Sequence, residues 1–232
     1  MSHSVQSHLR VSPNEYDVQI RRFIPGYEEM LDTVCRYLRY LAERGEKEML
    51  ITELGSGTGG LTLQVARALP DASIVAVDCD ADMVEVARNR LGPFSKQVRY
   101  ITDTFDRALG SGSDAVIASL ALHHILVRST KTDLYKQIFS SLAHNGVFIN
   151  ADAAVDQDGS LSGFAYDAWI DHMVANGISR DHAVDHLRAW QMEDRYFSLA
   201  EELEMLKEAG LKQVDILWRR GPIAVIAAMK LP

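Results

Sequence analysis

The sequence predicts a single α/β domain, spanning residues 1–232, built on a doubly wound and mostly parallel sheet. Two observations support this fold class. Short apolar runs alternate with segments of helical periodicity from about residue 28 onward, which is the pattern of βαβ units. The last two apolar runs are separated only by Gly221-Pro222, so we expect them to pair as an antiparallel hairpin. Five parallel strands and this hairpin make a seven-stranded sheet.

The first half of the chain supplies three strands, each preceded by a helix. Apolar side chains at helical spacing mark the helices, and short apolar runs mark the strands. Pro70 stops the second helix and Gly92-Pro93 stops the third. In order, the expected elements are helix 28–44, strand 49–54, helix 61–69, strand 73–77, helix 81–91 and strand 98–101.

The second half continues this alternation of strands and helices and then departs from it. A turn at residues 144–146 leads into the fifth strand, and residues 153–196 then insert extra helical pattern before the last helix. We therefore expect a helical insertion over residues 153–196. In order, the expected elements are strand 115–120, helix 132–142, strand 147–151, helices 165–175, 182–192 and 199–209, and strands 214–219 and 223–229.

Composition and charge limit the partners. A net charge of −8 disfavours a polyanion, so we expect no DNA partner and consider tRNA disfavoured. The two cysteines, Cys35 and Cys79, match no metal-ligand spacing and fit a reducing cytosol. The longest apolar stretch, 223–229, is too short to span a bilayer. We expect a cytoplasmic protein that acts on a small molecule. Whether it forms a homodimer stays an open question.

A glycine-rich loop, from Glu53 to Gly60, connects the first strand to the next helix. Such a loop allows close approach of the backbone to a ligand at a helix N-terminus. The loop also fits the dinucleotide pattern G-x-G-x-x-G, and Asp78 lies near the position of a ribose-binding acid. Glu53 favours S-adenosylmethionine (SAM) over NAD, because a carboxylate suits an ammonium group and repels a pyrophosphate. The closing hairpin is also foreign to the usual dinucleotide fold.

The order E-x-G-x-G-x-G, Asp78, Asp103 and closing hairpin resembles the class I SAM-dependent methyltransferase family, which has a Rossmann-like fold. The resemblance covers nearly the whole chain. It implies that the loop holds the methionine portion of SAM, that Asp78 binds the ribose hydroxyls, and that Asp103 and Thr104 face the adenine edge. The cofactor residues implied are Glu53, Gly55, Ser56, Gly57, Gly59, Asp78, Cys79, Met83, Asp103, Thr104 and Ser119.

The fourth strand leads into Ser119 and then into His123 and His124. In the resembled family this stretch borders the transferred methyl group, so the two histidines are candidates for a catalytic base or for holding the acceptor. A structural role for histidines at the start of this helix remains an equal alternative. No Asn-Pro-Pro-Tyr type of motif and no Cys-Pro pair occurs here, so nucleobase methylation of those kinds is unsupported.

The I-P-G-Y run at residues 24–27, together with the insertion and the final hairpin, resembles a subgroup that includes carboxy-SAM synthase and small-molecule (type 12-like) methyltransferases. The resemblance implies a lid built from an N-terminal arm, 1–27, and from residues 153–196, which would exclude water. Candidate substrate-binding residues are Tyr16, Tyr27, Trp169 and Arg188, the last at a position where the synthase handles a carboxylate. Neighbouring residues depart from the synthase pattern.

We predict no metal site. His182 and His186 stand four residues apart on an expected helix, but a single pair without carboxylates is weak evidence for a metal. The expected activity is transfer of the SAM methyl group to an oxygen, nitrogen or sulfur atom of a small acceptor. The alternatives are a carboxy-SAM synthase-like enzyme that uses SAM as substrate and a non-catalytic SAM-binding protein, with an NAD-dependent oxidoreductase a distant fourth.

Overall fold

The computed structural model describes residues 12, 15–45 and 48–231. Seven strands form one sheet in the order β3-β2-β1-β4-β5-β7-β6. The first five are parallel, and β7 pairs antiparallel with β5 and with β6. This arrangement confirms the predicted fold class. The strands are β1 Leu50–Leu54, β2 Ser73–Asp78, β3 Val98–Thr102, β4 Ser113–Ser119, β5 Leu142–Ala153, β6 Lys212–Arg220 and β7 Ile223–Met229.

Helices cover both faces of the sheet because alternate strand residues point to opposite faces and both sets are apolar. Ile51 and Ile117 belong to the core beneath one group of helices, and Leu54 and Val116 belong to the core beneath the other. The first group is α3 Tyr27–Ala42, α4 Gly60–Ala68 and α5 Ala81–Arg90, and the second is α6 Phe105–Ala108, α7 Arg128–Ser141 and α10 Leu199–Glu208.

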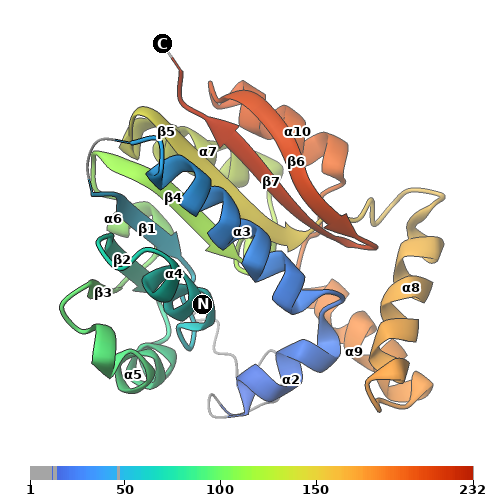
Figure 1. The fold of residues 1–232 in the computed structure, drawn as a ribbon. Coiled ribbons are helices and arrows are strands. Elements are labelled where there is room, and N and C mark those ends of the chain that lie inside the picture. Colours follow the sequence, from blue (N-terminus) through green and yellow to red (C-terminus); the bar gives the residue numbers. More distant parts are fainter. Residues whose placement is uncertain (1–11, 13–14, 46–47, 232) are drawn as a thin grey trace.

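Three further helices, α2 Tyr16–Phe23, α8 Ser162–Ala175 and α9 Arg180–Glu193, lie together beyond the carboxyl ends of the parallel strands (Figure 1). Hydrogen bonds join them across a long sequence separation. The indole Nε1 of Trp169 donates to the Phe23 carbonyl at 2.6 Å, and Arg22 donates to the carbonyls of Asn176 and Gly177 at 2.9 and 3.0 Å. The N-terminal helix is therefore fixed to the insertion, on the side where ligands of α/β sheets bind.

The structure differs from the sequence-based expectation at several elements, including the short helix α6, which the sequence analysis does not predict. Tyr16–Phe23 is helical, where the sequence predicts only an arm, because its apolar face is buried by α8, a distant segment. Helix α7 begins at Arg128, four residues before the predicted start. Strand β5 begins at Leu142 and includes the predicted turn, where Asn145 has a φ of 61° and the pairing with β4 shifts register. Within the described residues, no helix has the length and apolarity needed to cross a membrane.

Candidate active site

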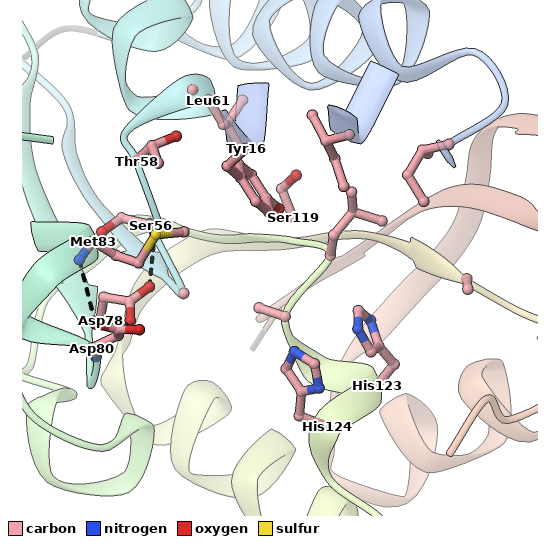
Figure 2. A pocket seen from close by; sticks show the side chains of 18 of the residues that line it. Tyr16, Ser56, Thr58, Leu61, Asp78, Asp80, Met83, Ser119, His123 and His124 are labelled. Carbon is pink, nitrogen blue, oxygen red and sulfur yellow. Dashed lines mark hydrogen bonds between the residues drawn. The ribbon is translucent and has the colours of Figure 1, made fainter. Parts of the chain in front are cut away.

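A cavity lies at the carboxyl ends of β1, β2 and β4, beneath α2, α8 and α9. Figure 2 shows Ser56 and Asp78 on one side of it and His123 and His124 on the other. We call these sides the cofactor half and the acceptor half. The cofactor half consists of the loop after β1 and the residues after β2, and the acceptor half consists of the two histidines with the side chains around them from α2, α8, α9 and the end of β5.

The glycine loop of the cofactor half is held in a shape that requires glycine. Gly55 has a φ of 71°, and a Cβ atom there would lie 2.3 Å from the Cβ of Ala121. The amides of Gly55 and Ser56 both donate to the carbonyl of Val77, at 2.8 and 2.9 Å, and the Gly57 amide donates to Asp78 Oδ2 at 2.7 Å. The loop is therefore fastened to the end of β2, and its inner side lines the cavity.

Two acids of the cofactor half are shielded from water. Glu53 is 1% exposed and accepts a hydrogen bond from Thr62 Oγ1 at 2.6 Å. Burial, and secondarily the charge of Asp78, raises the Glu53 pKa to about 8. Asp78 accepts one backbone amide on each oxygen, from Gly57 and from Asp80, and burial still raises its pKa. The Cys79 amide also lowers the Asp78 pKa through a hydrogen bond, and because a carboxylate has about four lone-pair positions, at least one remains for a ligand hydroxyl.

The residues present fit SAM. Within the described residues, the buried Ser56 hydroxyl has no hydrogen-bond partner, which suits a ligand acceptor such as a carboxylate. Glu53 suits an ammonium group, and the two Asp78 oxygens suit a ribose diol. Most of the cofactor residues predicted from the sequence line the cavity: Glu53, Gly55, Ser56, Gly57, Asp78, Cys79, Met83 and Ser119.

Three predicted cofactor residues do not line the cavity. Gly59 packs against α5, since a Cβ atom there would lie 2.9 Å from Leu91 Cδ1. Asp103 is turned back onto its own chain, where Oδ1 accepts the Thr104 amide at 2.8 Å, and Thr104 is exposed. Phe105, which the sequence analysis does not single out, lines the cavity instead. An aromatic residue shortly after the end of β3 is the signal that points to it.

In the acceptor half, His123 and Asp152 form a buried pair. Asp152 Oδ1 lies 2.6 Å from His123 Nδ1, and Asp152 Oδ2 accepts the backbone amides of Leu122 and His123 at 3.0 and 3.1 Å. A carboxylate at this position makes Nδ1 the protonated nitrogen, which leaves Nε2 as the nitrogen that exchanges protons. Sequence analysis misses Asp152, although it stands near the end of a parallel strand, as Asp78 does.

Opposing effects set the pKa of His123. Burial alone lowers the pKa, but the carboxylates of Asp152 and Asp194 outweigh it, so the His123 pKa is raised above its ordinary value of 6.5. Burial alone would raise the Asp152 pKa, but the charges of His123 and Lys131 outweigh it, so the Asp152 pKa is lowered. Asp152 therefore remains a carboxylate in contact with the ring.

Asp194 lies at the centre of the rest of the acceptor half. His124 Nδ1 is 2.8 Å from Asp194 Oδ1, Tyr196 donates its hydroxyl to Asp194 Oδ2 at 3.1 Å, and His123 Nε2 lies 3.8 Å from Oδ2. One ligand atom each from His123, His124 and Asp194 lies within 4.8 Å of the others, so these three residues could hold a divalent cation. His182 is exposed and His186 stacks on Trp190, so they take no part in this cluster.

Aromatic side chains line much of the cavity, and the Tyr27 hydroxyl lies beside Gly60 of the glycine loop. Tyr16, Tyr27 and Trp169, predicted from the sequence, all line the cavity, and burial raises the pKa of both tyrosines. Trp190 and Tyr196 line it as well and are missed by the sequence analysis. Arg188 is corrected here: its side chain is 75% exposed, lies 3.9 Å from Asp185, and does not line the cavity. Arg188 follows the buried Leu187 on α9 and therefore falls on the outer face of that helix.

Comparisons with known proteins relate the chain to methyltransferases and to SAM-using enzymes. Residues 52–148 match the family model of a methyltransferase domain. Along 216 residues, the chain is 26% identical to carboxy-S-adenosyl-L-methionine synthase of Nautilia profundicola, covering 93% of this chain and 90% of that one.

Solved methyltransferases share the fold. A magnesium protoporphyrin IX methyltransferase from Synechocystis PCC 6803, with bound SAM, superposes with a TM-score of 0.63 at 15% identity, covering 97% of this chain and 95% of that one. An O-methyltransferase family protein from Burkholderia thailandensis superposes with a TM-score of 0.66 at 15% identity, covering 88% of this chain and 56% of that one. This chain thus spans little more than half the length of the Burkholderia protein.

Proposed function

We propose that this chain, a SAM-dependent enzyme with the class I methyltransferase fold, transfers the methyl group of SAM to an oxygen, nitrogen or sulfur atom of a small acceptor, with His123 as the base. The observation that carries this proposal is the buried His123–Asp152 pair, because His123 lines the same cavity as the glycine loop and lies across it from Ser56 and Asp78. A histidine held by a carboxylate is a typical general base.

The cofactor half would hold SAM through three side chains. Ser56 would donate its unpartnered hydroxyl to the carboxylate of SAM, Glu53 would pair with the ammonium group, and Asp78 would accept from the ribose hydroxyls. When bound, SAM supplies an electrophilic methyl group on a sulfonium. The chain itself contributes binding, orientation and a dry environment.

The acceptor half would supply the proton transfer. Asp152 keeps His123 Nδ1 protonated, so Nε2 takes the proton that the acceptor loses as it attacks. The aromatic walls and the helices α2, α8 and α9 would exclude water and fix the acceptor against the methyl group. Because aromatic side chains line the cavity and the net charge is −8, we infer that the acceptor is a small molecule and that no nucleic acid binds.

A carboxy-SAM synthase-like activity is the second candidate. The likeness to the Nautilia enzyme over 93% of this chain, insertion included, favours it. Against it, Arg188, the residue expected to handle a carboxylate, lies on the outer face of α9.

Mass spectrometry of the ligand that copurifies with the full chain tests both candidates, followed by incubation with SAM and a panel of hydroxyl, amine and thiol metabolites. Methylated product together with S-adenosylhomocysteine supports methyl transfer. Copurified carboxy-SAM with no methylated product would contradict it and favour the synthase activity.

A further inference from the structure

Among the charged side chains around the cavity, acids predominate. Glu53, Asp78, Asp80 and Asp194 line it, and within the described part of the chain no lysine or arginine does. The nearby cations already have partners. Arg90 is paired with Asp17 and Thr58 at the rim, and the buried Lys131 is paired with Glu202 at 2.5 Å. An anionic acceptor would lose its hydration here without gaining a cationic side chain, which is costly.

Bound SAM would face only some of the carboxylates around the cavity. Glu53 and Asp78 lie in the cofactor half, where they face the ammonium and ribose ends of SAM. The acceptor half keeps two further carboxylates, Asp152 and Asp194, which are 4% and 5% exposed. When His123 is neutral, as a base must be, His124 can balance only one of these two carboxylates, and the nearby Lys131 is already paired with Glu202. A net negative charge therefore remains beside the acceptor, in a region of low dielectric where charges interact strongly.

The walls beside Asp194 are aromatic. Tyr196 contacts Asp194 through its hydroxyl, and its ring centroid lies 5.7 Å from that of Trp169. Trp190 lies 5.3 Å from Phe23 in an edge-to-face arrangement. Aromatic faces attract cations, and they also accommodate a compact apolar body. The combination of a buried carboxylate and aromatic walls is suited to an organic ammonium ion.

We propose that the acceptor is a primary or secondary amine on a compact, partly aromatic scaffold, bound as its ammonium ion beside Asp194 and methylated on nitrogen. This inference rests on the proposed function and names its substrate class.

The proposed reaction balances through His123. The ammonium ion first gives one proton to His123 Nε2, which becomes an imidazolium and later releases that proton to solvent. The amine nitrogen then forms a bond to the methyl carbon, while the sulfur–carbon bond breaks and its electron pair stays on sulfur. The products are an N-methylammonium ion, S-adenosylhomocysteine and one proton.

Three probes that share a phenyl ring and differ in the terminal group test the proposal: 2-phenylethylamine, 2-phenylethanol and 3-phenylpropanoate. Binding to the full chain saturated with S-adenosylhomocysteine is measured by calorimetry, and methyl transfer from SAM is measured by mass spectrometry. We expect the amine to exceed the other two in affinity and in kcat/KM by about tenfold or more. Equal or stronger use of the alcohol or the acid would overturn the amine inference and leave methyl transfer intact.

The other outcomes are also decisive. Amine binding without any methylated product would support the ammonium site and contradict the proposed function. No binding of the amine would overturn the inference, and the wider metabolite panel would then decide the function separately. In Asp194→Asn the preference for amine over alcohol should fall about tenfold or more, whereas the exposed Asp158→Asn should keep it. The wild-type comparison of the three probes stands even where Asp194→Asn fails to fold.

Discussion

The two halves of the cavity differ in how the chain builds them. The cofactor half comes from one stretch, residues 53–83, whose backbone turns bring Glu53, Ser56 and Asp78 together at two adjacent strand ends. The acceptor half gathers residues from α2, the end of β4, the end of β5, and α8 and α9. The first is a local unit and the second is a long-range assembly, so we expect specificity to be determined in the second.

This difference predicts that mutations in the two halves have separable effects. Changes in the cofactor half should weaken SAM binding and leave the chemical step largely intact. Changes in the acceptor half should slow the chemical step and leave SAM affinity intact. The effects below are ordered from the largest expected to the smallest.

Replacing His123 should have the largest effect. His123→Asn removes the base, so kcat should fall by about 100-fold to 10,000-fold, while SAM affinity measured by calorimetry stays within about twofold. The exposed His144→Asn is the matched control and should behave as wild type. Full turnover in a folded His123→Asn protein would remove His123 from the mechanism.

The pH profile sharpens the assignment of His123. Its pKa lies above 6.5, because Asp152 and Asp194 outweigh the effect of burial. A base must be unprotonated, so kcat should rise with pH through a midpoint above 6.5 and then level off. This rise should disappear from the residual activity of His123→Asn. A rise that persists in the variant belongs to another group.

Removing the N-terminal segment tests whether α2 belongs to the acceptor half. A chain that starts at Glu28 lacks Tyr16, Phe23 and Tyr27, so turnover should fall by roughly 100-fold because the acceptor is no longer aligned. Cooperative unfolding should be retained, as followed by circular dichroism. SAM affinity, measured by calorimetry, should fall less than turnover, because the deletion takes only the Asp17 contact with Thr58 and the Tyr27 side chain away from the glycine loop. Unaltered turnover would show that α2 is not part of the active site.

Asp78 provides the corresponding test in the cofactor half. Asp78→Asn replaces a carboxylate that accepts from two backbone amides and faces the cavity. SAM binding should weaken by about 1–3 kcal/mol, or roughly 5-fold to 150-fold. Turnover at saturating SAM should remain near wild type. The exposed Asp71→Asn is the control, and an unchanged SAM affinity in Asp78→Asn would exclude Asp78 as the ribose ligand.

Glu53 should couple SAM binding to pH. Because its folded pKa is raised to about 8 from an ordinary value of 4.5, Glu53 binds a proton between these values that the unfolded chain does not. The stability contributed by this group therefore falls as pH rises from 4.5 to 8. The SAM ammonium needs the carboxylate, so SAM affinity should rise across the same window. Glu53→Gln should flatten both dependences, and the exposed Glu43→Gln should preserve them.

Chelation should have the smallest effect. His124 Nδ1 lies 2.8 Å from Asp194 Oδ1, so a proton shared by this pair occupies a position that a metal would need. Turnover should be unchanged after dialysis against EDTA. Loss of activity, restored by a divalent cation, would instead assign His123, His124 and Asp194 as metal ligands.

The sequence predicts the cofactor half better than the acceptor half, for a physical reason. Glycines at a tight turn and acids at strand ends are local signals, so the amino-acid sequence alone is enough to locate the loop and Asp78. Phe105 is missed because a lone aromatic residue after a strand is a weak signal, and Asp103 does not line the cavity, since its Oδ1 accepts the Thr104 amide.

The acceptor half depends on contacts between distant segments, which periodicity does not reveal. Asp152 and Asp194 meet His123 only because β5 and the residues after α9 end beside η2 Leu122–His124. Helix α2 forms against α8, and its eight residues would not be stable alone. Arg188 illustrates the same limit, since its position along α9 determines whether it faces the cavity or solvent.

Single-turnover methyl transfer tests the separation of the two halves most directly. Wild type, Asp78→Asn and His123→Asn would each be saturated with SAM, mixed with the methyl acceptor found by screening, and quenched over time, with SAM affinity measured in parallel. The account predicts that Asp78→Asn weakens SAM binding but keeps the wild-type rate constant at saturation, whereas His123→Asn keeps SAM affinity and loses the rate. A parallel change of both quantities in either variant would contradict it.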